Sequence, residues 1–285
     1  MNPTDISFPH LGIYLHQVPK SFTVFGFSIA LYGVIIACGM VFGILLASHV
    51  AKQNGFDPNL VWDFAVYGII FGVIGARVYY VIFAWDKNQY QNNLLSIFNT
   101  RNGGLAIYGG VIAAFLTLAV FARKRKISFF TMADICVPGL ALGQVMGRWG
   151  NFFNREAFGQ YTDGLFAMRL PIAAVRSNDI SAALAAHIVA GTGYIQVHPT
   201  FLYESCWNLV LIFILLFWEK RKKFEGEVFL LYLGGYGLGR SWIEGLRTDQ
   251  LLIPGTNMAV SQILAVLLIF FTVTADFIQR KRKIL

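Results

Sequence analysis

Long apolar runs alternate with short polar connections along most of the chain. Seven of these runs are close to the roughly 20 residues that an α-helix needs to cross a bilayer. They are predicted at residues 23–50, 60–84, 103–122, 129–149, 199–218, 226–245 and 258–279. We therefore predict an all-α fold: a polytopic integral membrane protein with about seven transmembrane helices, forming a single domain over residues 1–285.

Clusters of basic residues predict the orientation of these helices. Runs of four Lys and Arg residues follow the third, fifth and seventh apolar runs, at 123–126, 220–223 and 280–283. An odd number of spans places all three clusters on one side, which should be the cytoplasm because basic loops are retained there. The C-terminus would then be cytoplasmic. The outward-facing parts would be the N-terminus and the connections at 85–102, 150–198 and 246–257.

The connection at 150–198 is much longer than the others, and long connections are commonly functional. We expect it to form a small extracytoplasmic head segment, with a short helix in its alanine-rich stretch at 181–190. The first 20 residues lack the pattern of a removable signal peptide, so we expect a short amphipathic lead-in to the first span.

Composition agrees with a protein that faces lipid. The chain is 56% hydrophobic and 13% charged, whereas soluble domains carry about 25% charged residues. Its net charge of +8 comes largely from clusters between apolar runs, which argues against a nucleic-acid-binding face. Cys38, Cys136 and Cys206 lie inside apolar runs, and we expect them to be small core residues, neither disulfide partners nor nucleophiles.

The densest group of polar residues is GRWGNFFNREAFG at 147–159, at the end of the fourth apolar run. It contains two arginines, a glutamate and two asparagines among glycines and aromatics. An arginine at the centre of a membrane helix costs about 2.5–3.5 kcal/mol on insertion scales. The group therefore indicates a polar ligand near the membrane surface, and the fork of donors on Arg148 suits a phosphate.

A second polar set lies in the sixth run, where Tyr236, Arg240 and Glu244 follow at steps of four residues and form one stripe of a helix. The simplest interpretation is an Arg–Glu pair within the helix. The alternative is that Arg240 lies level with Arg148, where the two would repel unless negative charge lay between them. Three glutamates could supply part of that charge and leave room for one phosphodiester: Glu156, Glu204 and Glu244.

Two further polar features are less specific. Arg77 lies in the outer half of the second run, too far from Asp63 to pair with it. The glycine-rich stretch at 103–110 could bring the backbone close to a ligand, or only allow tight helix packing. No residues have metal-ligand spacing and no GxSxG motif occurs, so we predict neither a metal nor another cofactor.

The stretch at 147–159 matches without a gap the pattern G-R-x-G-N-F-x-N-x-E-x-x-G, and the chain thereby resembles the bacterial prolipoprotein diacylglyceryl transferases. Further blocks of that family occur in order along nearly the whole chain. They are Leu31-Tyr32-Gly33, residues 103–110, His198-Pro199 with Tyr203-Glu204, and Tyr236-Gly237 with Arg240 and Glu244.

The resemblance implies an enzyme of the bacterial cytoplasmic membrane. Such an enzyme moves the diacylglyceryl group of phosphatidylglycerol to the thiol of a lipobox cysteine in a prolipoprotein signal peptide. A thioether forms and glycerol phosphate is released. The implied partners are phosphatidylglycerol, prolipoprotein signal peptides and the lipid bilayer, without nucleic acid, and the active site would face the extracytoplasmic side.

The matching positions suggest a role for each site residue. Arg148 and Arg240 would hold the phosphate and stabilise it as the C–O bond breaks. Asn151 and Asn154 would orient the glycerol head group or the peptide. Glu156 and Glu244 would fix the arginine side chains. The substrate-binding set is completed by Tyr32 and Tyr236, whose hydroxyls could hydrogen-bond the substrate, and by Gly159, Arg77 and Glu204.

One position departs from the family. Many members have His-Gly-Gly where this chain has Tyr108-Gly109-Gly110, and that histidine is often discussed as the base for the thiol. A tyrosine, with an ordinary pKa near 10, is a poor base at neutral pH. We therefore expect Tyr108 to position substrate within the catalytic site. Either a glutamate takes the proton, or the arginine pair lowers the thiol pKa enough for water to do so.

Two alternatives to this enzyme stay open. A transporter for an anionic solute would also place arginines inside a helix bundle, but transporters commonly have internal repeats, and none is visible here. A catalytically silent, lipid-binding member of the same family is the other. Against it, every position of the 147–159 pattern is filled.

Overall fold

The computed structural model describes residues 4–86, 90–100, 103–188, 191–253, 255–256 and 258–284. The chain divides into two compact units, one made of Met1–Gly43 and Pro138–Leu285 and the other of Ile44–Val137. Helices α1 (Leu31–Gln53) and α4 (Phe129–Asn154) each contribute to both units. The single domain expected from the sequence therefore stays a prediction.

Long helices occupy the predicted apolar runs. Besides α1 and α4 they are α2 (Asn59–Phe83), α3 (Ile107–Arg125), α6 (Thr200–Glu219), α7 (Glu227–Ile243) and α8 (Val260–Ile284). Among the described residues, six helices are long and apolar enough to span a bilayer. The prediction of a mostly helical, multi-pass membrane protein is confirmed.

The predicted span outside these six is the sixth apolar run, which contains α7, a helix of 17 residues. At 1.5 Å per residue it is about 26 Å long, slightly less than the roughly 30 Å of a hydrocarbon core. A 3-10 turn, η6 (Glu244–Leu246), continues it directly. Seven spans therefore remain a prediction.

The first helix begins later than predicted. Residues 23–30 were assigned to the first span, but a hairpin of β3 (Ser21–Val24) and β4 (Phe27–Ala30) occupies this stretch. Phe25 and Gly26 form its turn with φ of 48° and 83°, the conformation that two-residue hairpins favour. The strands are rich in aromatic and β-branched residues, which fit a strand as well as a membrane helix.

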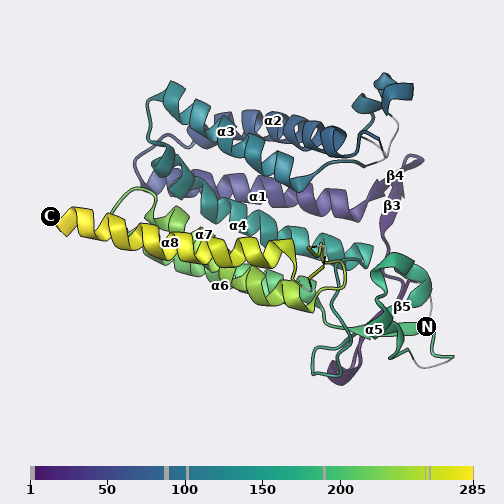
Figure 1. The fold of residues 1–285 in the computed structure, drawn as a ribbon. Helices are drawn as coiled ribbons and strands as arrows, with labels where there is room; N and C mark the ends of the chain where they lie inside the picture. Colours follow the sequence, from purple (N-terminus) through teal and green to yellow (C-terminus); the bar gives the residue numbers. More distant parts are fainter. Residues whose placement is uncertain are drawn as a thin grey trace. The chain divides into compact units, whose positions relative to one another are not determined.

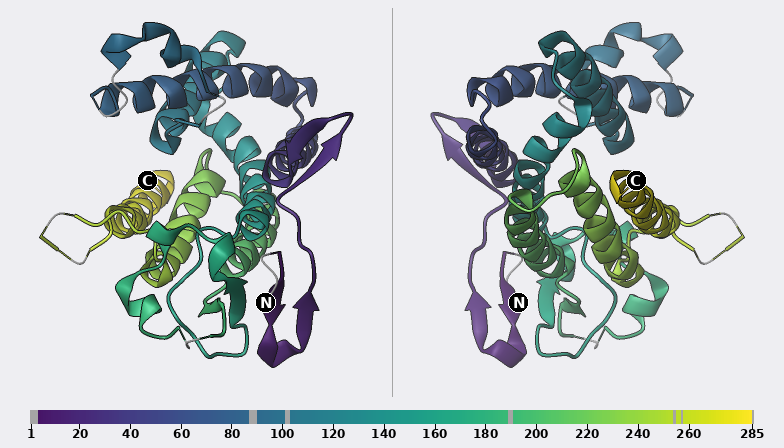
Figure 2. Two further views of the ribbon diagram at one scale, coloured as in Figure 1. Left: turned by 90° about the vertical axis from the view of Figure 1, so that its right-hand side faces the viewer. Right: turned by 90° about the vertical axis from the view of Figure 1, so that its left-hand side faces the viewer.

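The extracytoplasmic head segment predicted at 150–198 contains a small antiparallel sheet with the order β2-β1-β5-β6 (Figure 2). Its strands are β1 (Ile6–Phe8), β2 (Ile13–Leu15), β5 (Met168–Pro171) and β6 (Tyr194–Val197). The first residues of the chain are thus strands that complete the sheet, a feature that the all-α expectation did not include. Ile6, Phe158 and Leu170 are fully buried at its core.

Short helical turns connect these elements. The predicted helix at 181–190 is only α5 (Ala182–Ala185), whose first turn is capped by the Ser181 hydroxyl; residues 189–190 lie outside the described part. The 3-10 turns are η1 (Pro9–Leu11), η2 (Tyr90–Asn92), η3 (Leu94–Phe98), η4 (Ile172–Ala174), η5 (Ser177–Asp179) and η6.

In the unit that contains the head, α7 packs against both α6 and α8 (Figure 1). Glycines on α7 permit this close approach. A Cβ on Gly237 would lie 3.0 Å from the Ala265 carbonyl oxygen of α8, and one on Gly234 would lie 2.8 Å from the Thr272 hydroxyl. This packing fixes the position of Arg240, one turn further along α7.

In the other unit, α2 and α3 lie side by side (Figure 1). They pack at Gly75 and Gly109: a Cβ on Gly75 would lie 2.7 Å from the carbonyl oxygen of Gly109. Helix α3 begins at Ile107, so residues 103–106 of the third predicted run lie in the preceding loop.

Candidate active site

Arg148 of α4 and Arg240 of α7 meet at one carboxylate. The Oε2 atom of Glu204, on α6, lies 2.6 Å from Nη2 of Arg148 and 3.4 Å from Nη1 of Arg240. The Glu204 side chain is only 5% exposed, so water screens these interactions weakly. The two arginines from distant parts of the sequence therefore share one buried counter-charge.

Arg240 also forms the intrahelical pair that the sequence suggested. Its Nη2 lies 2.5 Å from Oε2 of Glu244, four residues later. The pair is not self-contained, because the same guanidinium reaches Glu204 on another helix. Arg240 therefore forms the intrahelical pair with Glu244 and also lies near Arg148, with the Glu204 carboxylate between the two arginines.

A third arginine, Arg247, joins the cluster and was not predicted. Its Nη1 lies 3.3 Å from Oε1 of Glu204, its Nε 3.9 Å from Oε2 of Glu244, and its Nη2 2.7 Å from Oδ2 of Asp249. It follows η6 in what the sequence presented as an outer loop, where a single arginine is ordinary. Its spacing of three residues from Glu244 was the only available signal.

The charges around Arg247 affect the pKa of its guanidinium more strongly than burial does. Burial alone would lower the pKa of the guanidinium, but the hydrogen bonds to Asp249 and the charges of Asp249, Glu204 and Glu244 raise it. Burial likewise works against the ionised form of Asp249, yet Arg247 holds the pKa of that carboxyl below its usual range. Both groups are therefore charged at neutral pH.

The charges of the cluster balance when Asp249 is counted. Three arginines, at 148, 240 and 247, face two buried carboxylates, those of Glu204 and Glu244. Asp249 is a further partner of Arg247 at the edge, where its side chain is 32% exposed. Three cations thus face three carboxylates, and a phosphodiester would compete with these carboxylates for the arginine donors.

The cluster is closely packed. A cavity of about 10 Å³ lies beside Glu204 and Arg240, lined also by Trp207, Asn208 and Tyr236. This volume holds about one water molecule. A phosphate does not fit in this cavity, so it would reach the arginines at their exposed parts, which are 10–21% of each side chain.

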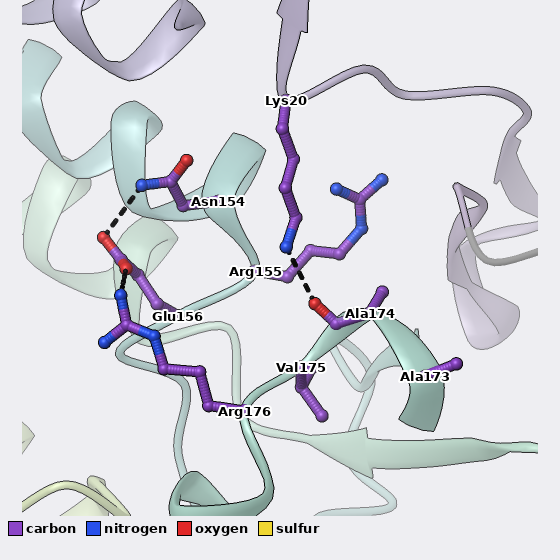
Figure 3. Close-up of a pocket in the computed structure, with 8 residues that line it drawn as sticks. All are labelled: Lys20, Asn154, Arg155, Glu156, Ala173, Ala174, Val175 and Arg176. Atoms are coloured by element: carbon purple, nitrogen blue, oxygen red, sulfur yellow. Dashed lines mark hydrogen bonds and ion pairs between the residues drawn. The ribbon is translucent and has the colours of Figure 1, made fainter.

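Glu156 contacts the cluster through Asn151. Asn151 donates from Nδ2 to Oε1 of Glu156 at 3.1 Å, and its own Oδ1 lies 3.5 Å from Nη1 of Arg148. Asn154 donates to the same Oε1 at 3.3 Å. The partner of Oε2 is Arg176, at 3.2 Å (Figure 3), a residue that the sequence analysis did not single out.

Three other predicted residues lie close to this network. The ring of Tyr32 packs on Gly150, where a Cβ would lie 2.6 Å from it. Tyr236 stacks on Tyr232 with ring centroids 5.9 Å apart and lines the small cavity. Gly159 donates its N–H to the His198 carbonyl at 2.9 Å and forms an isolated β-bridge with Arg247. Its bare backbone permits this approach.

Arg77 belongs to the other unit and is tied to a loop. A guanidinium has five N–H donors, and all five donate to backbone carbonyls, those of Ser96, Ile97, Asn99, Gly103 and Gly104. Gly103 and Gly104 have φ of 88° and 81°, a conformation that glycine adopts readily. We infer that Arg77 organises this loop, contrary to the expected contact with substrate.

Tyr108 is the second residue of α3, in the same unit as Arg77. Its side chain is 43% exposed, and its ring centroid lies 6.4 Å from that of Tyr79. The adjacent Gly109 is the residue that packs against α2. The Tyr-Gly-Gly sequence thus combines an exposed phenol with a tight helix contact.

Comparisons with known proteins show the family to which the chain belongs. A family model described as prolipoprotein diacylglyceryl transferase matches residues 19–278. A phosphatidylglycerol–prolipoprotein diacylglyceryl transferase of Finegoldia magna is 38% identical over 92% of this chain and 96% of its own length. Proteins of the same name from Clostridioides difficile and Listeria innocua are 41% identical over 84% and 40% identical over 90% of the chain, each covering 87% of the relative. The chain belongs to the prolipoprotein diacylglyceryl transferase family.

Proposed function

We propose that this protein transfers the diacylglyceryl group of phosphatidylglycerol to the lipobox cysteine of prolipoproteins. The observation that carries the proposal is the cluster of three arginines around Glu204, in a chain whose relatives are named for this reaction. Nothing comparable favours transport of an anionic solute.

The reaction exchanges a C–O bond for a C–S bond. The cysteine sulfur attacks the glyceryl carbon that bears the phosphate ester. The bond from that carbon to the phosphate oxygen breaks, and its electron pair leaves with the phosphate. The thiol proton ends on the released glycerol phosphate or in solvent, so the atoms and charges balance.

The arginines stabilise the leaving phosphate. In the lipid the phosphodiester carries one negative charge, and a second charge develops on its ester oxygen as the C–O bond breaks. Arg148 and Arg240 present planar donor forks to that group, with Arg247 as the third cation. Donors already in place at a weakly hydrated site are most effective at stabilising developing charge.

The carboxylates and amides hold the arginine N–H donors in position. Glu204 prevents the three guanidinium groups from separating before lipid arrives, and Glu244 holds Arg240 from one turn away. Glu156 acts on Arg148 through Asn151. Tyr32, Tyr236 and Asn154 surround this set and supply hydroxyl and amide groups for the glycerol head group or the peptide backbone.

The same positive field favours the thiolate. A cysteine thiol with an ordinary pKa near 8.5 is mostly protonated at neutral pH, and adjacent cations lower that pKa. Glu204 and Glu244 already balance arginines, which makes them poor acceptors for the thiol proton. We therefore assign deprotonation to the arginine field, with water as acceptor, and a positioning role to Tyr108.

The setting that suits this chemistry is the bacterial cytoplasmic membrane. The basic clusters at 123–126, 220–223 and 280–283 support a cytoplasmic location for the connections that contain them. The head and the arginine cluster would then face the extracytoplasmic side, where signal peptides emerge.

The test uses purified protein in detergent, phosphatidylglycerol and a peptide with a lipobox cysteine. Mass spectrometry should detect a gain of one diacylglyceryl unit on that peptide. A peptide with serine in place of the cysteine should gain nothing, and Arg148→Ala should abolish the product. No mass gain, or equal use of phosphatidylethanolamine, would contradict the proposal.

A further inference from the structure

An open cavity of about 400 Å³ lies in the head, next to the end of α4 (Figure 3). Three separate segments line it: the residue before β3, the loop after α4, and the turn that includes η4. Its polar lining consists of Lys20, Asn154, Arg155, Glu156 and Arg176. The proposed mechanism uses Asn154 and Glu156 but none of the three basic residues.

The lining carries more positive than negative charge. The lining includes three cations, Lys20, Arg155 and Arg176, and one carboxylate, that of Glu156. Arg155 is 3% exposed and is fixed by bonds from Nη2 to the carbonyls of Thr4 and Val18, so it supplies a stationary charge. The cavity therefore favours an anion.

Lys20 can offer donors to such an anion. Its Nζ donates to the Ala174 carbonyl at 2.9 Å, and an ammonium has three donors. Lys20 is exposed as a whole, so solutes can reach it from solvent. Arg176 is extended, with 74% of its side chain exposed.

Glu156 connects this cavity to the arginine cluster. One of its oxygens accepts from Asn151, whose own oxygen approaches Arg148, and the other pairs with Arg176. A continuous set of polar contacts therefore runs from Arg148 to the cavity.

We propose that this cavity binds the phosphate monoester that the reaction releases, and so serves as a product site between the arginine cluster and solvent. The inference rests on the proposed function, because that reaction generates glycerol phosphate. A phosphodiester has one negative charge, whereas a phosphate monoester carries about −1.5 to −2 at pH 7. The cations at Lys20 and Arg176 therefore attract the product more strongly than the lipid.

The experiment measures binding directly, without turnover. Isothermal titration of the purified full-length protein in zwitterionic detergent would use glycerol phosphate as ligand, with inorganic phosphate and glycerol as comparisons. We expect saturable binding of glycerol phosphate, weaker binding of inorganic phosphate and none of glycerol. Phosphatidylglycerol added to saturation should leave the affinity for glycerol phosphate within about twofold, because the lipid occupies the arginine cluster.

Lys20→Gln retains a donor for Ala174 but removes the charge, and it should weaken binding about tenfold. The matched control is Arg169→Gln, since Arg169 is another head cation, on β5, where its Nε donates to Gln196 outside the cavity. Equal affinities of wild type and Lys20→Gln, equal loss in both variants, or competition by phosphatidylglycerol would overturn the proposal. The peptide assay above, run separately, reports whether the transfer reaction itself fails.

Discussion

Glu204→Gln is the substitution that most directly perturbs the arginine cluster. It preserves the size of the side chain but removes the charge that Arg148, Arg240 and Arg247 share, and it replaces one acceptor oxygen by an NH2 donor. The cluster would gain one net positive charge. We expect the free protein to be destabilised and its affinity for a lipid phosphate to rise.

The size of the effect follows from burial. Removing one partner of a buried ion pair costs about 3–5 kcal/mol. The three arginine side chains are 10–21% exposed, which favours the lower end, about 3 kcal/mol. A loss of 1 kcal/mol lowers the Tm of a chain of this length by about 2 °C. The expected fall is therefore about 6 °C.

Thermal unfolding in detergent with zwitterionic lipid measures this difference, and a second series includes phosphatidylglycerol. The lipid phosphate should replace the missing negative charge and reduce the difference in Tm between the variant and the wild type. The matched control is Glu219→Gln at the other end of α6, a buried glutamate paired with Lys222 at 2.6 Å. Phosphatidylglycerol should not reduce the Tm difference between this variant and the wild type.

Two results would refute the reasoning. If Glu204→Gln unfolds at the wild-type temperature, Glu204 does not hold the arginines together. The cluster does not accept the lipid phosphate in place of a carboxylate if phosphatidylglycerol leaves the Tm difference between Glu204→Gln and wild type unchanged. The same conclusion follows if the lipid reduces the Tm difference of Glu219→Gln equally.

Two further substitutions test separate parts of the account. Tyr108→Phe should retain activity near the wild-type level in the peptide assay, because we assign the phenol no proton transfer. A loss of several orders of magnitude would show that the Tyr108 phenol acts as an acid or base. Gly75→Ala should lower the free energy of unfolding by about 1–3 kcal/mol, as overpacking does, because its Cβ would meet the Gly109 carbonyl oxygen at 2.7 Å. Gly72→Ala on the same helix, where nothing lies within 4 Å of the added Cβ, should change stability little, and equal effects of the two substitutions would contradict the packing at Gly109.

The membrane helices could be predicted from the sequence because their signal is long and local. Twenty apolar residues in succession have few alternatives in a chain of this composition. The hairpin before α1 was missed because Phe22, Val24 and Phe27 are apolar residues that fit a membrane helix as well as a strand. The head sheet was missed because β1 and β5 pair across more than half of the chain.

The candidate site was predictable where a motif concentrated the polar residues. Arg148 and Arg240 were both identified, although no spacing could show that Glu204 lies between them. Arg247 was missed because its burial depends on the fold of the segment after α7. Arg77 was expected to bind substrate, whereas its hydrogen-bond partners are loop carbonyls that only the folded chain brings within reach.

The most direct test of the central claim measures both products of one reaction. Phosphatidylglycerol and the lipobox peptide are incubated with the protein, and the thioether peptide and glycerol phosphate are quantified together over time. The account predicts equal amounts of the two products, and loss of both in Arg148→Gln and Arg240→Gln. Glycerol phosphate without thioether, thioether without glycerol phosphate, or full activity in either variant would contradict it.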